Sequence, residues 1–67
     1  MPDQARAKGI PVRAKYSYQG RADDELTFAK GDQIVVFGKA RNKGWYKGRH
    51  AATGKIGLVA GTYVVKD

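Results

Sequence analysis

The sequence predicts an all-β fold, a small barrel of five short strands, and three observations favour it. From Val12 onward, apolar residues alternate with polar ones or form short β-branched runs, as strand residues do. Polar segments that contain glycine interrupt these runs, and no stretch has a helical period. A chain of 67 residues forms one domain at most, and closing a small sheet into a barrel removes its exposed edges.

The first part of the chain predicts a leader, one strand and a long loop. Residues 1–10 are polar and lack periodicity, so we expect a flexible leader, with residues 11–67 forming the domain. Val12–Tyr16 alternates apolar and charged residues, as a half-buried strand does. Residues 17–25 are polar and predict a loop, after which Leu26–Phe28 alternates again.

The second part predicts four further strands. Gln33–Phe37 is rich in β-branched and aromatic residues. Trp45–His50 carries Gly48 in its interior, which predicts that another segment packs closely on the backbone there. Gly54 can take a positive φ and favours a tight hairpin. The remaining elements are a turn at 30–32, a loop at 38–44, the hairpin at 51–54, a strand at 55–59, a 3₁₀ turn at 61–63 and a strand at 64–66.

Alternation along these strands separates an inward set of residues from an outward one. Val35, Phe37 and Tyr46 alternate away from the core and are expected to be partly exposed. The residues expected to face inward are Ala14, Leu26, Phe28, Ile34, Val36, Gly48, Val59 and Val64.

Composition limits the classes of function. The chain has no cysteine, which excludes disulfides and thiolate metal sites, and no apolar run approaches the roughly 20 residues of a membrane span. The net charge is +7, distributed as +4 over residues 1–22, −3 over residues 23–32 and +6 over residues 33–67. The basic segments could attract anionic partners, and the acidic segment could hold an Arg or Lys of a ligand.

Nothing in the sequence indicates catalysis. His50 is the single histidine and has no evident carboxylate or cysteine companion, so we expect neither a catalytic nor a metal-binding role for it. Ser17, Thr27 and Thr53 likewise lack a base. We therefore predict a protein that is not an enzyme and that uses no cofactor.

Four aromatic residues are the best candidates for binding. Tyr16 and Tyr18 are two positions apart, so in an extended segment they can share one side. If the fold brings Trp45 and Tyr63 beside them, the result is an aromatic groove. Such grooves bind extended ligands, especially proline-rich ones.

Four motifs in the same order carry a resemblance to SH3 domains. Ala14–Tyr18 resembles the ALYDY motif, and Trp45–Tyr46 resembles the WW pair. Asp24–Phe28 followed by Lys30–Asp32 resembles the DELSF…KGD segment, and Gly57–Val64 resembles the GYIPSNYV ending. The resemblance covers about residues 11–66. It implies a five-stranded SH3 barrel with an RT loop at 17–32, an n-Src loop at 38–44 and a distal hairpin at 51–54.

The resemblance also implies a groove for PxxP peptides in the polyproline II conformation. Its first pocket would use Tyr16 and Tyr63, and its second would use Tyr18, Trp45 and Tyr63. A specificity pocket would set Trp45 against Glu25, with Asp23 or Asp24 nearby, to hold a ligand arginine. The sequence leaves the orientation of the ligand open.

Several positions depart from the family pattern. Ala60 replaces the groove proline, Thr62 replaces the usual asparagine, Leu58 replaces an aromatic residue and Ser17 replaces the aspartate of ALYDY. The n-Src loop is basic where it is often acidic. We therefore expect a groove of altered or weakened specificity that favours ligands with acidic flanking residues.

A basic patch supports an alternative function, namely the binding of nucleic acid or of an anionic membrane by an SH3-like barrel. A second alternative is an atypical SH3 domain that binds the surface of a folded protein. The leading prediction remains a monomeric signalling or adaptor module in the cytoplasm, at membrane-associated or cytoskeletal complexes, that binds proline-rich segments of other proteins. The basic patch consists of Lys39, Arg41, Lys43, Lys47 and Arg49.

Overall fold

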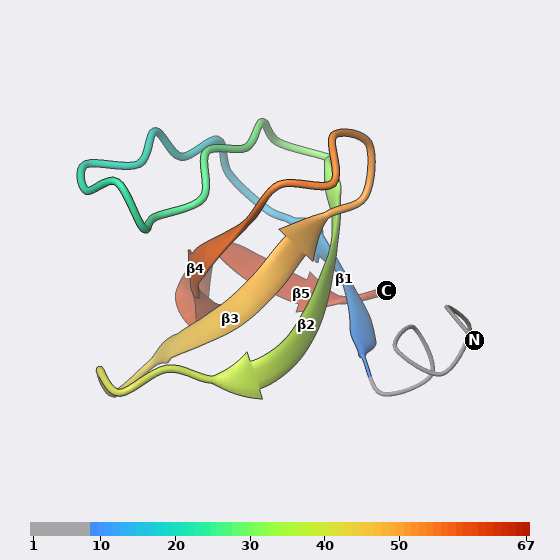
Figure 1. The fold of residues 1–67 in the computed structure, drawn as a ribbon. Coiled ribbons are helices and arrows are strands. Elements are labelled where there is room, and N and C mark those ends of the chain that lie inside the picture. Colours follow the sequence, from blue (N-terminus) through green and yellow to red (C-terminus); the bar gives the residue numbers. More distant parts are fainter. Residues whose placement is uncertain (1–8) are drawn as a thin grey trace.

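The structure is a computed structural model that describes residues 9–67, and its elements are five strands and one short 3₁₀ helix (Figure 1). The predicted leader lies outside the described residues except for Gly9 and Ile10. The elements are β1 (Ile10–Ala14), β2 (Gln33–Lys39), β3 (Trp45–His50), β4 (Ile56–Ala60), η1 (Gly61–Tyr63) and β5 (Val64–Lys66).

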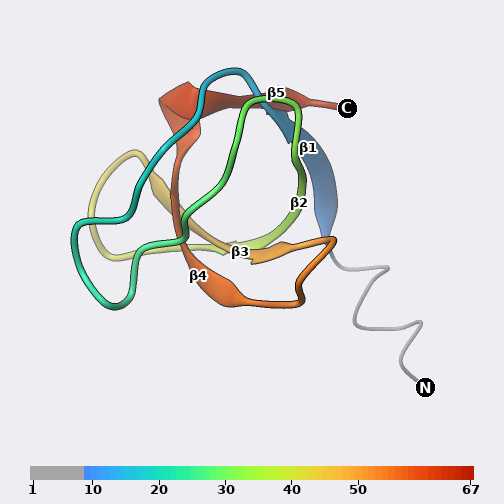
Figure 2. The same ribbon diagram turned by 90° about the horizontal axis from the view of Figure 1, so that it is seen from above.

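All five strands form one antiparallel sheet in the order β4-β3-β2-β1-β5. Seen from above, the sheet curves into a ring in which η1 joins its two end strands, β4 and β5 (Figure 2). The predicted all-β fold, a small five-stranded barrel, is confirmed. Among residues 9–67, no helix is both long and apolar enough to cross a membrane.

The core forms where the inward faces of the strands meet the base of the RT loop. Ile34 and Val59 are fully buried, and Val36 and Val64 pack against the core while remaining partly exposed. Val12 is also buried, although we did not predict it. The buried cluster consists of Val12, Ala14, Leu26, Phe28, Ile34 and Val59.

Three strands have boundaries that differ from the prediction. Strand β4 is Ile56–Ala60, one residue later than the predicted strand at 55–59. The first strand is Ile10–Ala14 and not Val12–Tyr16, because its register is set by pairing with β2 and β5, and both ladders end before Lys15. Strand β2 runs on to Lys39, so the n-Src loop begins at Ala40. A register shift between Val36 and Gly38 marks a bulge in β2, and it leaves Phe37 43% exposed.

Glycines occupy backbone positions at which other residues would be strained or would clash. Gly31, Gly44 and Gly54 have positive φ, at the ends of the RT loop, the n-Src loop and the distal hairpin. A Cβ at Gly48 would lie 3.0 Å from Ile34 Cγ2 and 3.1 Å from Val59 Cγ2. The predicted close approach at Gly48 is therefore confirmed.

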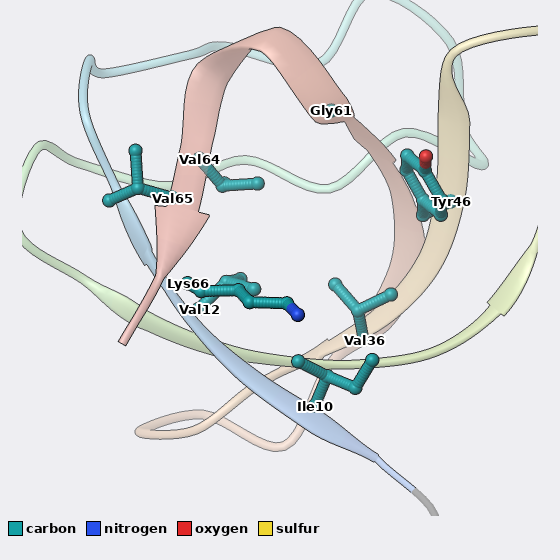
Figure 3. A pocket seen from close by; sticks show the side chains of 8 residues that line it. All are labelled: Ile10, Val12, Val36, Tyr46, Gly61, Val64, Val65 and Lys66. Carbon is teal, nitrogen blue, oxygen red and sulfur yellow. The ribbon is translucent and has the colours of Figure 1, made fainter.

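The base of the barrel, away from the RT loop, holds an apolar cavity of about 260 Å³ (Figure 3). Tyr46 and Val36 line this cavity together, so Tyr46 does not share the outward face of Val35 as alternation predicted. The reason is that Tyr46 precedes Gly48 by two residues on β3 and shares its inward side. Tyr46 is nevertheless partly exposed, because it lies at the open end of the barrel.

His50 has a carboxylate companion, contrary to our expectation. Its Nε2 lies 2.8 Å from Asp32 Oδ2, and the Ala29 amide donates to the same oxygen at 2.9 Å. The β2–β3 register causes this contact, because it places His50 opposite Ile34, two residues from Asp32. The hydrogen bond ties the end of the RT loop to the distal hairpin. No cluster of three metal-binding side chains occurs in residues 9–67.

Candidate functional site

The structure brings the four predicted aromatic residues into one continuous row. The ring centroids of Tyr16 and Tyr63 are 5.7 Å apart, those of Tyr63 and Tyr18 are 5.2 Å apart, and those of Tyr18 and Trp45 are 6.1 Å apart. All three contacts are edge-to-face, a favourable geometry for aromatic pairs. Tyr16 is 57% exposed, and the other three rings are partly buried. The row therefore presents a shallow strip of aromatic surface.

Elements far apart in the sequence position these rings. Tyr16 and Tyr18 flank the first residue of the RT loop, Trp45 begins β3 and Tyr63 ends η1. The Lys15 amide donates to the Tyr63 carbonyl at 2.7 Å, which holds η1 beside the start of the RT loop. The RT and n-Src loops project to the same side of the barrel, cyan to green and yellow in Figures 1 and 2. The row thus extends to the side on which the two loops project.

The RT loop is held in shape by its own small ladder and by β4. Tyr18 and Phe28 exchange backbone hydrogen bonds of 2.8 and 2.9 Å, and their side chains also contact each other. In the part of the loop that packs on β4, the Leu26 amide donates to the Leu58 carbonyl and the Leu58 amide donates to the Asp24 carbonyl, at 2.9 and 2.7 Å. The acidic segment is therefore fixed against the barrel.

Glu25 is oriented beside the aromatic row. Its Oε1 accepts hydrogen bonds from the Tyr18 hydroxyl and from the Arg21 amide, both at 2.7 Å. These bonds hold the pKa of Glu25 below its usual value, the Arg21 amide having the larger effect. The hydrogen bond to Glu25 in turn raises the pKa of Tyr18. Within residues 9–67, Oε2 takes no hydrogen bond, so the ionised carboxylate keeps one oxygen for a ligand cation.

Asp23 and Asp24 occupy different positions relative to this carboxylate. Both side chains are exposed near the tip of the RT loop. Asp24 uses its backbone carbonyl to bind Leu58, whereas its carboxylate makes no hydrogen bond within the described part of the chain. The two aspartates add negative charge near Glu25 but are not held by side-chain contacts as Glu25 is.

The wall of the groove opposite the RT loop is low. Ala60 pairs with Trp45 across the β3–β4 ladder and is buried, so its methyl group adds little surface. Thr62 is exposed in the middle of η1. The Gly61 amide donates to the Gly44 carbonyl at 2.8 Å, which ties η1 to the end of the n-Src loop.

The predicted basic patch divides into two parts. Lys39 and Lys43 line a depression of about 200 Å³ that also includes Trp45, on the n-Src side. Lys47 and Arg49 alternate with the buried positions of β3, so they lie on its outer face. Arg41 lies at the tip of the n-Src loop and is exposed.

Sequence reasoning missed contributions that come from the backbone or from unexpected partners. The amide of Arg21 fixes Glu25, and the Ser17 hydroxyl accepts from the Lys30 amide at 3.0 Å across the neck of the RT loop. Leu58 forms a backbone bridge with Glu25, which holds this part of the RT loop against β4. Gly20 and the acidic residues 23–25 indicated a loop in the sequence. No residue pattern could show which backbone amide would bind the Glu25 carboxylate.

Comparisons with known proteins agree with this geometry. A sequence model of the family described as SH3 domain matches residues 13–60. The chain is 41% identical over 63 residues to "Protein kinase C and casein kinase substrate in neurons protein 1" of Mus musculus. It is 37% identical over 62 residues to "Protein kinase C and casein kinase substrate in neurons protein 2" of Gallus gallus. These matches cover 94% and 92% of the chain but only 14% of each relative.

Two solved structures also resemble the chain. One is the Acanthamoeba myosin I SH3 domain bound to Acan125, with a TM-score of 0.78 and 42% identity, covering 90% of this chain and 98% of that one. The other is the C-terminal SH3 domain of myosin IB from Entamoeba histolytica bound to an EhFP10(GEF) peptide. It has a TM-score of 0.78 and 33% identity, covering 90% and 95% of the two chains.

Proposed function

This chain belongs to the SH3 domain family, and on that premise we propose that it binds proline-rich segments of other proteins through the row of Tyr16, Tyr63, Tyr18 and Trp45. The SH3 domain is a peptide-binding interaction module, and we propose no catalytic step for this one. The observation that carries the proposal is that the four rings are in contact beside an oriented carboxylate. Such a surface suits a polyproline II ligand, which is already extended and loses little chain entropy on binding.

A ligand arginine or lysine would bind between Trp45 and Glu25. The free Oε2 of Glu25 supplies a charged acceptor, and the indole of Trp45 supplies a face for stacking. Asp23 and Asp24 would add attraction over a longer range. The low wall at Ala60 gives the second pocket less contact area than a proline would, so we expect modest affinity for a minimal PxxP peptide.

The charge of the n-Src loop would select among ligands. Lys39, at the end of β2, and Lys43 line one depression with Trp45, and Arg41 is exposed in the n-Src loop beside them in the sequence. Flanking acidic residues on a peptide would be attracted to these side chains, and flanking basic residues would be repelled.

The test is to titrate two proline-rich peptides with the same core, one with acidic and one with basic flanks. Trp45 is the single tryptophan, so its fluorescence reports binding directly. The acidic-flanked peptide should bind several-fold more tightly, and the difference should shrink with added salt. Trp45→Ala, followed by calorimetry, should abolish binding, whereas Phe37→Ala, outside the row, should not. Equal affinities that ignore salt would contradict the charge selection, and absence of binding would contradict the function itself.

The cellular setting belongs to this proposal as well. The chain spans about 14% of the length of the curated relatives it matches, so the rest of any longer protein decides where the domain acts. The similarity to myosin I SH3 domains supports a cytoplasmic role at cytoskeletal or membrane-associated complexes. There the domain would act as a monomeric adaptor.

A further inference from the structure

The outer face of β3 carries a stripe of residues that starts inside the aromatic row and continues away from it. Trp45, Lys47 and Arg49 alternate with the inward positions Gly48 and His50, so all three side chains lie on the outer face. Trp45 belongs to the groove through its contact with Tyr18. In Figure 1, β3 runs from the n-Src loop towards the distal hairpin, so the two cations lie progressively farther from the groove.

Apolar side chains flank each cation across the sheet. Lys47 pairs with Leu58 on β4, and Arg49 pairs with Ile56 on β4 and with Val35 on β2. Ile56 is 68% exposed, which is high for a large aliphatic side chain in a strand. No acidic residue pairs with Lys47 or Arg49 on β2 or β4. On the side of the RT loop, Glu25 bridges Leu58 and lines a depression with Asp23 and Ile56. This surface combines positive charge with aliphatic contact area and continues directly from Trp45.

We propose that Lys47 and Arg49, with Leu58 and Ile56 beside them, form a second subsite that binds an acidic and aliphatic extension of the peptide held in the groove. The proposal rests on the proposed function, because Trp45 is shared by the groove and the stripe. Charge complementarity requires an anionic occupant, and continuity with the groove makes that occupant the same peptide chain.

Strand geometry sets the spacing that the peptide must have. Strand residues rise about 3.3 Å each, so Lys47 and Arg49 lie about 7 and 13 Å along β3 from Trp45. An extended peptide advances about 3.1–3.4 Å per residue. Acidic residues should therefore stand about two and about four positions beyond the residue bound against Trp45. Glu25 borders the stripe through its bridge with Leu58, so a ligand cation belongs at Glu25 and the anions beyond it.

Other anionic occupants fit the stripe less well. Bases of nucleic acids bind single-strand sites largely by stacking on aromatic rings, and the cross-strand neighbours of Lys47 and Arg49 include no aromatic residue. A membrane surface would use charge and apolar contact together, but its binding would not depend on the groove. Dependence on a peptide in the groove therefore separates the proposed occupant from both.

The experiment compares three synthetic peptides that share one PxxP core with an arginine. The first is the core alone, and the other two add acidic residues at the second and fourth positions beyond the arginine, towards one end or the other. One extended peptide should bind about fivefold more tightly than the core at low salt, because two exposed ion pairs give gains of this size. Lys47→Ala with Arg49→Ala should remove the gain and leave affinity for the core unchanged.

A matched control is Lys30→Ala with Lys66→Ala, which changes net charge equally and leaves the stripe intact. This control variant should still bind the extended peptide more tightly than the core peptide. The wild-type domain should show the same gain for a second extended peptide that keeps the acidic residues at the predicted spacing but has a different residue between them. Loss of the gain in the control, or its retention in the Lys47 and Arg49 variant, would overturn the proposal. So would binding of phosphatidylserine vesicles that needs Lys47 and Arg49 when the extended peptides show no gain. Core binding without any gain overturns this proposal alone, whereas failure of all three peptides overturns the proposed function with it.

Discussion

At the scale of single residues, the site combines side chains that the sequence identifies with backbone groups that it does not. The rings of Tyr18 and Trp45 were predictable from motif and alternation. The orientation of Glu25 was not, because it depends on the Arg21 amide, which any residue at that position would supply. Likewise, His50 meets Asp32 only through the β2–β3 register. The sequence therefore identifies which side chains can bind a ligand or form a hydrogen bond. It does not identify the groups that the fold brings into contact with them.

Ala60 is the residue whose replacement tests the low wall of the groove. Its φ of −74° and ψ of 124° match the conformation of proline, so Ala60→Pro should fit without backbone strain. The ring would add apolar contact area beside Trp45 and stiffen the wall. We expect affinity for a PxxP peptide to rise several-fold by calorimetry, with the unfolding midpoint unchanged or higher. A drop in affinity with the fold intact would show that Ala60 does not form a wall of the site.

At the scale of elements, alternation located the strands, and pairing set their ends. Trp45–His50 was predicted with its true boundaries, because glycine-bounded loops enclose it. The first strand was misplaced by two residues, because apolar and charged residues continue to alternate after Ala14 while the ladders with β2 and β5 end. Tyr46 shows the same limit. The partial exposure of Tyr46 was predicted. Its position in the cavity at the base of the barrel was not, because that cavity forms only when the sheet closes.

The attachment of the RT loop to β4 is tested at Gly57. A Cβ there would lie 3.0 Å from the Leu26 amide nitrogen and 3.1 Å from the Asp24 carbonyl oxygen, and these backbone atoms cannot rotate away. Gly57→Ala should therefore lower the free energy of unfolding by about 1–3 kcal/mol in urea. It should also weaken peptide binding by displacing Glu25.

The matched control for Gly57→Ala is Gly38→Ala. A Cβ at Gly38 would meet only the flexible Lys47 side chain, at 3.9 Å. This control should change stability little and leave binding unchanged. If the two alanine variants had equal stability and affinity, the loop would not be held against β4 as described.

At the scale of the whole molecule, the carboxylates tie loops and chain end to the barrel, which predicts loss of stability in acid. Amide and phenol donors lower the pKa of Glu25, the Ala29 amide and His50 lower that of Asp32, and Gln33 and Arg13 lower that of Asp67. A lowered pKa in the folded state stabilises the fold above the unfolded values of 4.5 and 3.8. That contribution disappears as the pH falls through the folded values.

Urea unfolding at pH 7 and at pH 3, at constant ionic strength, measures this effect. We expect a lower midpoint at pH 3. Asp67→Asn should be less stable than the parent at pH 7 and should lose less on acidification, because it has no carboxylate at this position to protonate. An unchanged midpoint between the two pH values would show that these contacts do not contribute to stability.

The charge of the molecule also has a spatial order that its net value conceals. An acidic RT loop and a basic n-Src loop project from the same side of the barrel, and the outer face of β3 carries two further cations, Lys47 and Arg49. The sequence predicted the two signs and their segments. It also placed Lys47 and Arg49 in a strand. It could not show which residues flank them on the sheet, because those neighbours follow from the strand register.

The most direct test of the account is NMR shift mapping of the ¹⁵N-labelled domain with a proline-rich peptide and, separately, with an oligonucleotide. The peptide should shift the indole signal of Trp45 and the amides of Tyr18, Glu25 and Tyr63 in a saturable manner, while the oligonucleotide should leave these signals in place. Peptide-induced shifts absent from the aromatic row, together with saturable oligonucleotide shifts over Lys39–Arg49, would contradict it.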